Sequence, residues 1–253
     1  MSHGRRMLIT GRSCGQKTVK LEAMSATTNH ATLIARAIVS LAMIFFFSAV
    51  CNSDPDLLFD HCVADTAAAA AFHFNGLPCI DPATARADHF ATSALSEPTD
   101  PSATLFGFNA TVTSPAASLP GANAQGLAMA RIDLAPGGMA PLHSHPRASE
   151  VALVLSGGVL VGFADTSYRL YTQRLRAGEA FVFPRGMVHF MRNEDVSAPA
   201  VVLSGLNSQS PGAQLVPLSA FRTEPRLPDE VVKKTFRITG QDVQRIQRSL
   251  GGS

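Results

Sequence analysis

The sequence is poor in charge, and neither sign is in large excess. Only 16% of the 253 residues are charged, and 21 Lys and Arg against 19 Asp and Glu give a net charge of +2. A nucleic-acid-binding surface needs a clear basic excess, so this class of partner is not supported. Disorder is also disfavoured, because 46% of the residues are hydrophobic and disordered chains combine low hydrophobicity with high net charge.

No apolar run reaches the length of a membrane-spanning helix. The longest, residues 37–51, has 15 uncharged residues, whereas a spanning helix needs about 20. It follows a basic leader and ends in small residues, which is typical of a secretory signal peptide. We therefore predict that residues 1–53 are a leader and signal peptide, cut before Asp54, with Met1 or Met24 as the true start. An uncleaved signal anchor is the alternative.

The small positive charge belongs to that leader. Residues 1–53 contain one acidic side chain and six basic ones, Arg5, Arg6, Arg12, Lys17, Lys20 and Arg36. The remaining 200 residues carry 15 basic and 18 acidic side chains, a net charge of −3. The mature chain is thus predicted to be acidic, with no nucleic-acid partner and no membrane attachment after signal cleavage.

Cysteine is scarce, and two of the four cysteines lie in the predicted leader. Cys62 and Cys79 remain, with 16 residues between them, and a secreted chain would join them in a disulfide. Two buried thiols are the alternative if the chain is not secreted. Residues 109–111 form an Asn-Ala-Thr sequon, so secretion would also make Asn109 a site of N-glycosylation.

The mature chain lacks the long helices that a doubly wound α/β domain needs between its strands. Residues 54–120 are rich in Ala, Pro, Asp and Ser and predict loops and short strands. Short β-type runs separated by turn residues then follow, at 127–134, 151–155, 159–163, 168–175, 180–183, 187–191 and 200–206. This pattern predicts an all-β sandwich or barrel.

The periodicity becomes helical after Pro225. Residues 239–242 resemble a capping box, and Val243, Ile246 and Leu250 then place apolar groups on one face. A shorter helix is predicted at 229–236. The apolar face must be buried, either on a neighbouring subunit or on the same barrel.

Four residues suggest a metal centre. His143 and His145 are two apart and would share one face of an extended strand. Glu150 follows a Pro-Arg break, and His189 follows a Pro-Arg-Gly turn. Three imidazoles and one carboxylate form a donor set that suits a divalent transition metal.

The spacing of these residues resembles the two motifs of the cupin superfamily, in particular plant germins and germin-like proteins. Gly137, His143, His145, Glu150 and Gly157 fit the first motif. The second is matched by Gly178, Pro184, Gly186, His189 and Asn193. The similarity covers essentially all of residues 54–253.

The resemblance implies a single cupin jelly-roll β-barrel, with a core at about 120–222 and short C-terminal α-helices at about 226–250. It also implies manganese held by His143, His145, Glu150 and His189, and secretion to the plant apoplast and cell wall. The expected assembly is a homo-hexamer, a trimer of dimers, with a role in plant defence or stress.

Three functions are compatible with this resemblance: superoxide dismutase, oxalate oxidase producing hydrogen peroxide, and a non-enzymatic wall-associated or receptor-like binding protein. In germins that oxidise oxalate, two asparagines beside the metal hold the substrate. The first corresponds here to Ala130 or its neighbour Arg131, and the second to Ala140. Loss of amide donors disfavours oxalate oxidation, so superoxide dismutation is the preferred prediction.

Overall fold

The computed structural model describes residues 60–68 and 76–251. These residues all belong to one compact unit, Ser53–Ser253. The predicted leader, signal peptide and cleavage site lie outside the described residues. No described helix is long and apolar enough to cross a membrane.

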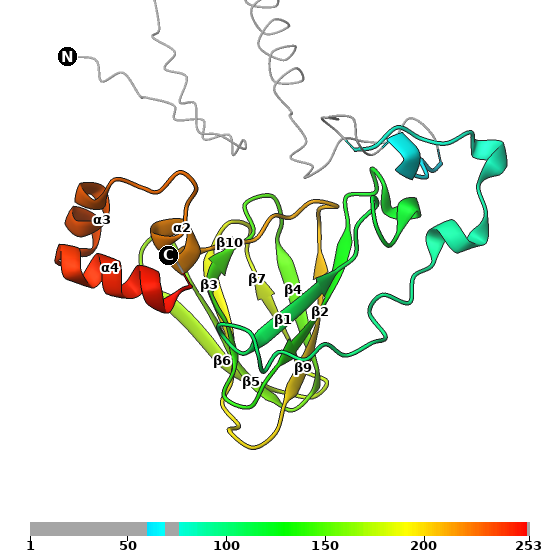
Figure 1. The fold of residues 1–253 in the computed structure, drawn as a ribbon. Helices are drawn as coiled ribbons and strands as arrows, with labels where there is room; N and C mark the ends of the chain where they lie inside the picture. Colours follow the sequence, from blue (N-terminus) through cyan, green and yellow to red (C-terminus); the bar gives the residue numbers. More distant parts are fainter. Residues whose placement is uncertain (1–59, 69–75, 252–253) are drawn as a thin grey trace, which may run out of the picture. The chain divides into compact units, whose positions relative to one another are not determined.

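Within the described residues, ten strands form two five-stranded antiparallel sheets that face each other (Figure 1). The first sheet has the order β1-β2-β9-β4-β7 and the second β10-β3-β8-β5-β6. Their bounds are β1 Phe108–Val112, β2 Ala128–Leu134, β3 Met139–Ser144, β4 Glu150–Ser156, β5 Gly158–Ala164, β6 Leu170–Arg176, β7 Ala180–Phe183, β8 Val188–Asn193, β9 Ala200–Leu206 and β10 Gln214–Leu215. The predicted jelly-roll β-barrel is confirmed.

The core lies between the sheets, because alternate residues of each strand point inward. Strand β9 shows the pattern most clearly, with Ala200, Val202, Ser204 and Leu206 all buried. The inward apolar side chains form one continuous cluster with those of β2, β4, β5 and β8. Burial of this cluster is the main driving force that brings the two sheets together.

Asn193 ties the end of β8 to the neighbouring turns. Its fully buried side-chain amide donates hydrogen bonds to the carbonyls of Ala135 and Ala198, and its oxygen accepts one from the Asp195 backbone. The role of this motif residue is therefore structural.

The segment before the barrel consists of loops and short 3-10 helices: η1 Thr66–Ala68, η2 Pro82–Thr84, η3 Ala87–Phe90 and η4 Pro120–Ala122. It also contains β1, which precedes the expected start of the core near residue 120. The sequence around β1 is interrupted by turn residues, and pairing with β2 decides its conformation.

Three helices follow the last strand: α2 Val216–Phe221, α3 Asp229–Phe236 and α4 Gly240–Ser249. The expected capping box of α4 is present, since Thr239 accepts from the Asp242 backbone and Asp242 accepts from that of Thr239. Helix α2 was not predicted, because six residues are too few for a helical period to show. Figure 1 shows α3 and α4 projecting to one side of the barrel, beyond α2.

Candidate metal centre

The two sheets bring the four predicted ligands together. His143 on β3 is the direct cross-strand partner of His189 on β8. Glu150 is the first residue of β4, in the opposite sheet. His145 lies just beyond the end of β3, not within the strand as expected, and the turn there still directs its ring toward the other three.

The potential ligand atoms of the four side chains all lie within 4.8 Å of one another. Nε2 of His145 is 3.0 Å from Oε2 of Glu150, and Nε2 of His189 is 3.3 Å from the same oxygen. His143, Glu150 and His189 are buried, whereas His145 remains slightly exposed. This is a compact and largely desolvated cluster of electron-pair donors.

Backbone carbonyls orient all three imidazoles. Nδ1 of His143 donates to the Pro141 carbonyl at 2.7 Å, and Nδ1 of His189 donates to the Met187 carbonyl at 2.8 Å. Nδ1 of His145 donates to the carbonyl of Gly212. A carbonyl can only accept, so each Nδ1 carries the proton and each Nε2 offers a lone pair to the cluster.

Glu150 is held by a residue that the sequence did not suggest. Its Oε1 accepts a hydrogen bond of 2.6 Å from the hydroxyl of Ser204 on β9, which leaves Oε2 for the cluster. The available signal was weak: Ser204 is a hydroxyl residue at an inward position between Val202 and Leu206.

The pKa values of the cluster reflect burial and mutual contact. Burial, aided by His189, lowers the pKa of His143 to about 4. Burial alone would raise the pKa of Glu150, but contact with His145 and His189 and the Ser204 hydrogen bond hold it well below its usual range. Burial would lower the pKa of His145, yet Glu150 and the Gly212 carbonyl outweigh burial and raise it.

The cluster fits a metal cation. Oε2 of Glu150 and Nε2 of His189 are buried and have no hydrogen-bond partner among the described residues, which is costly unless a cation lies between them. A divalent transition metal would accept a lone pair from each of the four side chains.

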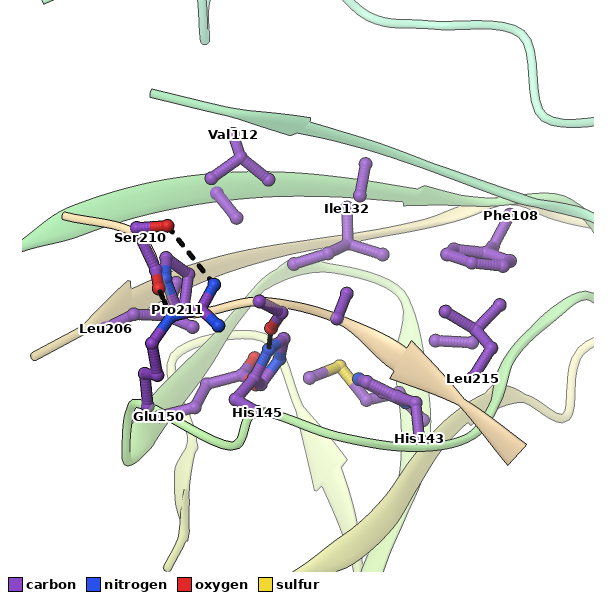
Figure 2. Close-up of a pocket in the computed structure, with 17 residues that line it drawn as sticks. Phe108, Val112, Ile132, His143, His145, Glu150, Leu206, Ser210, Pro211 and Leu215 are labelled. Carbon is purple, nitrogen blue, oxygen red and sulfur yellow. Dashed lines mark hydrogen bonds and ion pairs between the residues drawn. The ribbon is translucent and has the colours of Figure 1, made fainter. Parts of the chain in front are cut away.

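A cavity of about 300 Å³ opens from the cluster toward β1 and β2. His143, His145 and Glu150 line one side, and the other walls are mostly apolar (Figure 2). Ala130 and Ala140 both lie in these walls.

Three comparisons identify the family. Residues 95–244 match the cupin family model. The chain is 80% identical over 226 residues to germin-like protein 3-1 of Oryza sativa subsp. japonica. The matched region covers 88% of this chain and 99% of the relative. The chain belongs to the germin-like proteins of the cupin family. Germin-like protein subfamily 1 member 1 of Arabidopsis thaliana is 49% identical over 202 residues, 79% of this chain and 93% of the relative.

A solved structure of oxalate oxidase matches this germin-like chain with a TM-score of 0.74 at 38% sequence identity. The match covers 79% of this chain and all of the oxalate oxidase chain. The shared fold therefore accounts for most of this chain.

The cavity distinguishes the two candidates for the first asparagine position of the germin motif. Ala130 lines the cavity, whereas Arg131 points away and forms a bidentate pair with Asp133. Ala140 lines the cavity as expected. Neither alanine offers a side-chain donor to an anion.

The predicted disulfide and the predicted glycosylation site lie away from the cluster. Cys62 and Cys79 are joined by a disulfide in the segment that precedes the barrel. Asn109 is half-buried on β1, an edge strand, and its neighbours Phe108 and Ala110 point into the cavity. Arg147 lies at the cavity wall and donates to the carbonyl and hydroxyl of Ser210.

Proposed function

We propose that this chain is a secreted, manganese-binding germin-like protein of the plant apoplast that dismutes superoxide and does not oxidise oxalate. One observation carries the proposal: three imidazole Nε2 atoms and one carboxylate oxygen converge within 4.8 Å, and the second nitrogen of every imidazole is already used by a backbone carbonyl. Affinity order alone would favour copper or zinc, so geometry and supply must select manganese.

The chain would hold the ion with His143, His145, Glu150 and His189. Bound there, manganese would supply the one-electron oxidation and reduction that superoxide dismutation requires. The backbone carbonyls and Ser204 would keep the ligands in place when the charge of the ion changes. The cavity admits a small anion and needs to recognise little else, which suits superoxide.

Oxalate oxidation is the second candidate, because an oxalate oxidase shares the fold at 38% identity. The walls of the cavity argue against it. With Ala130 and Ala140 in place of two amides, a dianion finds no side-chain donor at these positions. A donor aimed at developing charge contributes about 3 kcal/mol to transition-state stabilisation, so the loss of two should suppress turnover strongly.

Secretion is supported by the disulfide between Cys62 and Cys79, since disulfides persist in oxidising compartments. We assign residues 1–53 to the leader and signal peptide and residues 54–253 to the mature germin-like domain. Asn109 is assigned as the glycosylation site, because its side chain alternates with residues that face the cavity.

A hexamer, built as a trimer of dimers, is supported by the C-terminal helices. Helices α3 and α4 project from the barrel and leave Val231 and Phe236 substantially exposed, at 51% and 44%. Apolar side chains exposed on projecting helices are suited to docking on a neighbouring subunit.

A parallel assay tests the proposed activity. Purified mature protein, His143→Ala and the control His61→Ala are analysed for metal content, superoxide dismutation and oxalate-dependent peroxide release. His61 contacts Phe90, away from the cluster. We expect about one manganese ion per chain and superoxide dismutation in the unmodified protein and His61→Ala only, with negligible oxalate turnover.

Each other outcome has a distinct meaning. Absence of any transition metal would overturn the metal centre. Robust oxalate turnover would favour the oxidase, and a metal-loaded chain without either activity would favour the binding protein, the third candidate.

A further inference from the structure

The cavity beside the metal centre has two unlike sides. One side carries the metal-directed atoms of His143, His145 and Glu150. Figure 2 shows Val112, Ile132 and Phe108 across the cavity from these residues, with Leu215 beside them. A ligand that fills the cavity must therefore be polar at one end and apolar along the rest.

The apolar side follows from strand geometry. Phe108, Ala110 and Val112 alternate along β1, and Ala130 and Ile132 alternate along the neighbouring β2, so all five face the cavity. Val112 faces inward and is still 45% exposed. Solvent therefore reaches this apolar wall.

The other polar side chains at the cavity are already engaged. The guanidinium of Arg147 donates to the carbonyl and hydroxyl of Ser210, and Oε1 of Glu150 accepts from Ser204. The Gly212 carbonyl accepts from His145. The metal position is thus the main anchor for a negative charge on the side of the cavity formed by β1 and β2, where a second charge on the same ligand would lie against apolar side chains.

We propose that the centre binds a small monocarboxylate with an aromatic or branched aliphatic body. Its carboxylate would ligate the bound ion, and its body packs against Val112, Ile132 and Phe108. This inference rests on the proposed metal centre. A cavity of about 300 Å³ is at the small end of ligand sites, which suits a single ring. Dicarboxylates are disfavoured because burying an unpaired charge is costly.

Phenylacetate, acetate and oxalate are suitable probes, titrated calorimetrically into manganese-loaded protein whose metal content is measured first. Acetate has the carboxylate without the ring, and oxalate has a second carboxylate in place of the ring. We expect phenylacetate to bind at least about tenfold more tightly than acetate, because its ring buries apolar area, and more tightly than oxalate. Equal affinities for phenylacetate and acetate, or tightest binding of oxalate, would overturn the inference.

A matched pair of variants locates the ring. Val112→Asn should weaken phenylacetate binding about tenfold and leave acetate binding unchanged. Val182→Asn makes the same change at an exposed position of β7 outside the cavity and should change neither. Equal effects of both variants would contradict the assigned wall.

Metal content separates the two proposals. A chain that retains no metal overturns the proposed function, and it also overturns the inference, because the ligand needs the bound ion. A metal-loaded chain without preference for phenylacetate overturns the inference alone.

Discussion

The hydroxyl of Ser204 donates a hydrogen bond of 2.6 Å to Oε1 of Glu150, and both side chains are buried. Ser204 lies on β9 and Glu150 on β4, neighbouring strands of one sheet. This contact leaves Oε2 as the oxygen that faces the three imidazoles. Ser204 is thus a positioning residue for the metal centre.

Ser204→Ala should lower manganese affinity about 10- to 100-fold, the usual effect of removing a group that orients a ligand. Competition with a chelator measures this change. Ser249→Ala is the control, because the Ser249 hydroxyl donates only to a carbonyl within α4. Unchanged affinity in Ser204→Ala would show that the hydrogen bond does not orient Glu150.

Asp133→Asn should destabilise the barrel by about 3 kcal/mol at neutral pH, because it breaks a buried ion pair with Arg131. Burial raises the pKa of Asp133, but hydrogen bonds from Arg131 and Thr99 outweigh burial and lower it. The stabilisation is therefore present above the unfolded pKa of about 3.9 and is lost as pH falls through the lower folded value.

Urea unfolding at a series of pH values tests this dependence. The gap in free energy of unfolding between the original chain and Asp133→Asn should narrow below about pH 4. Glu194→Gln serves as the control, because the Arg174–Glu194 pair is exposed and should contribute under about 1 kcal/mol. A gap that is constant with pH would exclude an electrostatic origin.

Reduction of the disulfide between Cys62 and Cys79 should lower the free energy of unfolding by about 3 kcal/mol, the chain-entropy value for a loop of this length. Unfolding with and without reductant measures the difference. The double variant Cys62→Ser, Cys79→Ser should have the lower free energy of unfolding already without reductant, and reductant should not change it. A reductant effect in that variant would point to another cause.

Gly138→Ala should destabilise the chain by about 1–3 kcal/mol through overpacking. A Cβ at Gly138 would lie 2.0 Å from the Gly107 carbonyl oxygen, so the backbone before β3 would have to shift. Gly240→Ala is the matched control, since no atom lies within 4 Å of its added Cβ at the start of α4. Thermal unfolding distinguishes them, and equal melting temperatures would contradict the close approach.

Local patterns predicted much of the fold. Short β-type runs predict seven strands, and both β7 and β9 have the expected bounds. The capping box of α4 was also read correctly, because Thr239 and Asp242 interact within one helical turn. Short segments such as α2 and β1 carried too little periodicity to be recognised.

The candidate ligands were also found from spacing, since the two motifs hold them at fixed distances from turn residues. Spacing could not show that Glu150 reaches the imidazoles from the opposite sheet, or that Ser204, over 50 residues away, holds it. Spacing also could not show whether Arg131 or Ala130 faces the cavity, because pairing of β2 with β1 decides this.

The sequence by itself therefore determined the strand-rich domain and named the four candidate ligands, since each depends on composition or motif spacing along the chain; the signal segment stays a prediction. Only the tertiary structure decided what surrounds those donors. The carbonyl of Gly212, the hydroxyl of Ser204 and the apolar wall of β1 reach the centre through long-range strand pairing and packing of the two sheets. Such contacts depend on which strands become neighbours, and no local pattern encodes that choice.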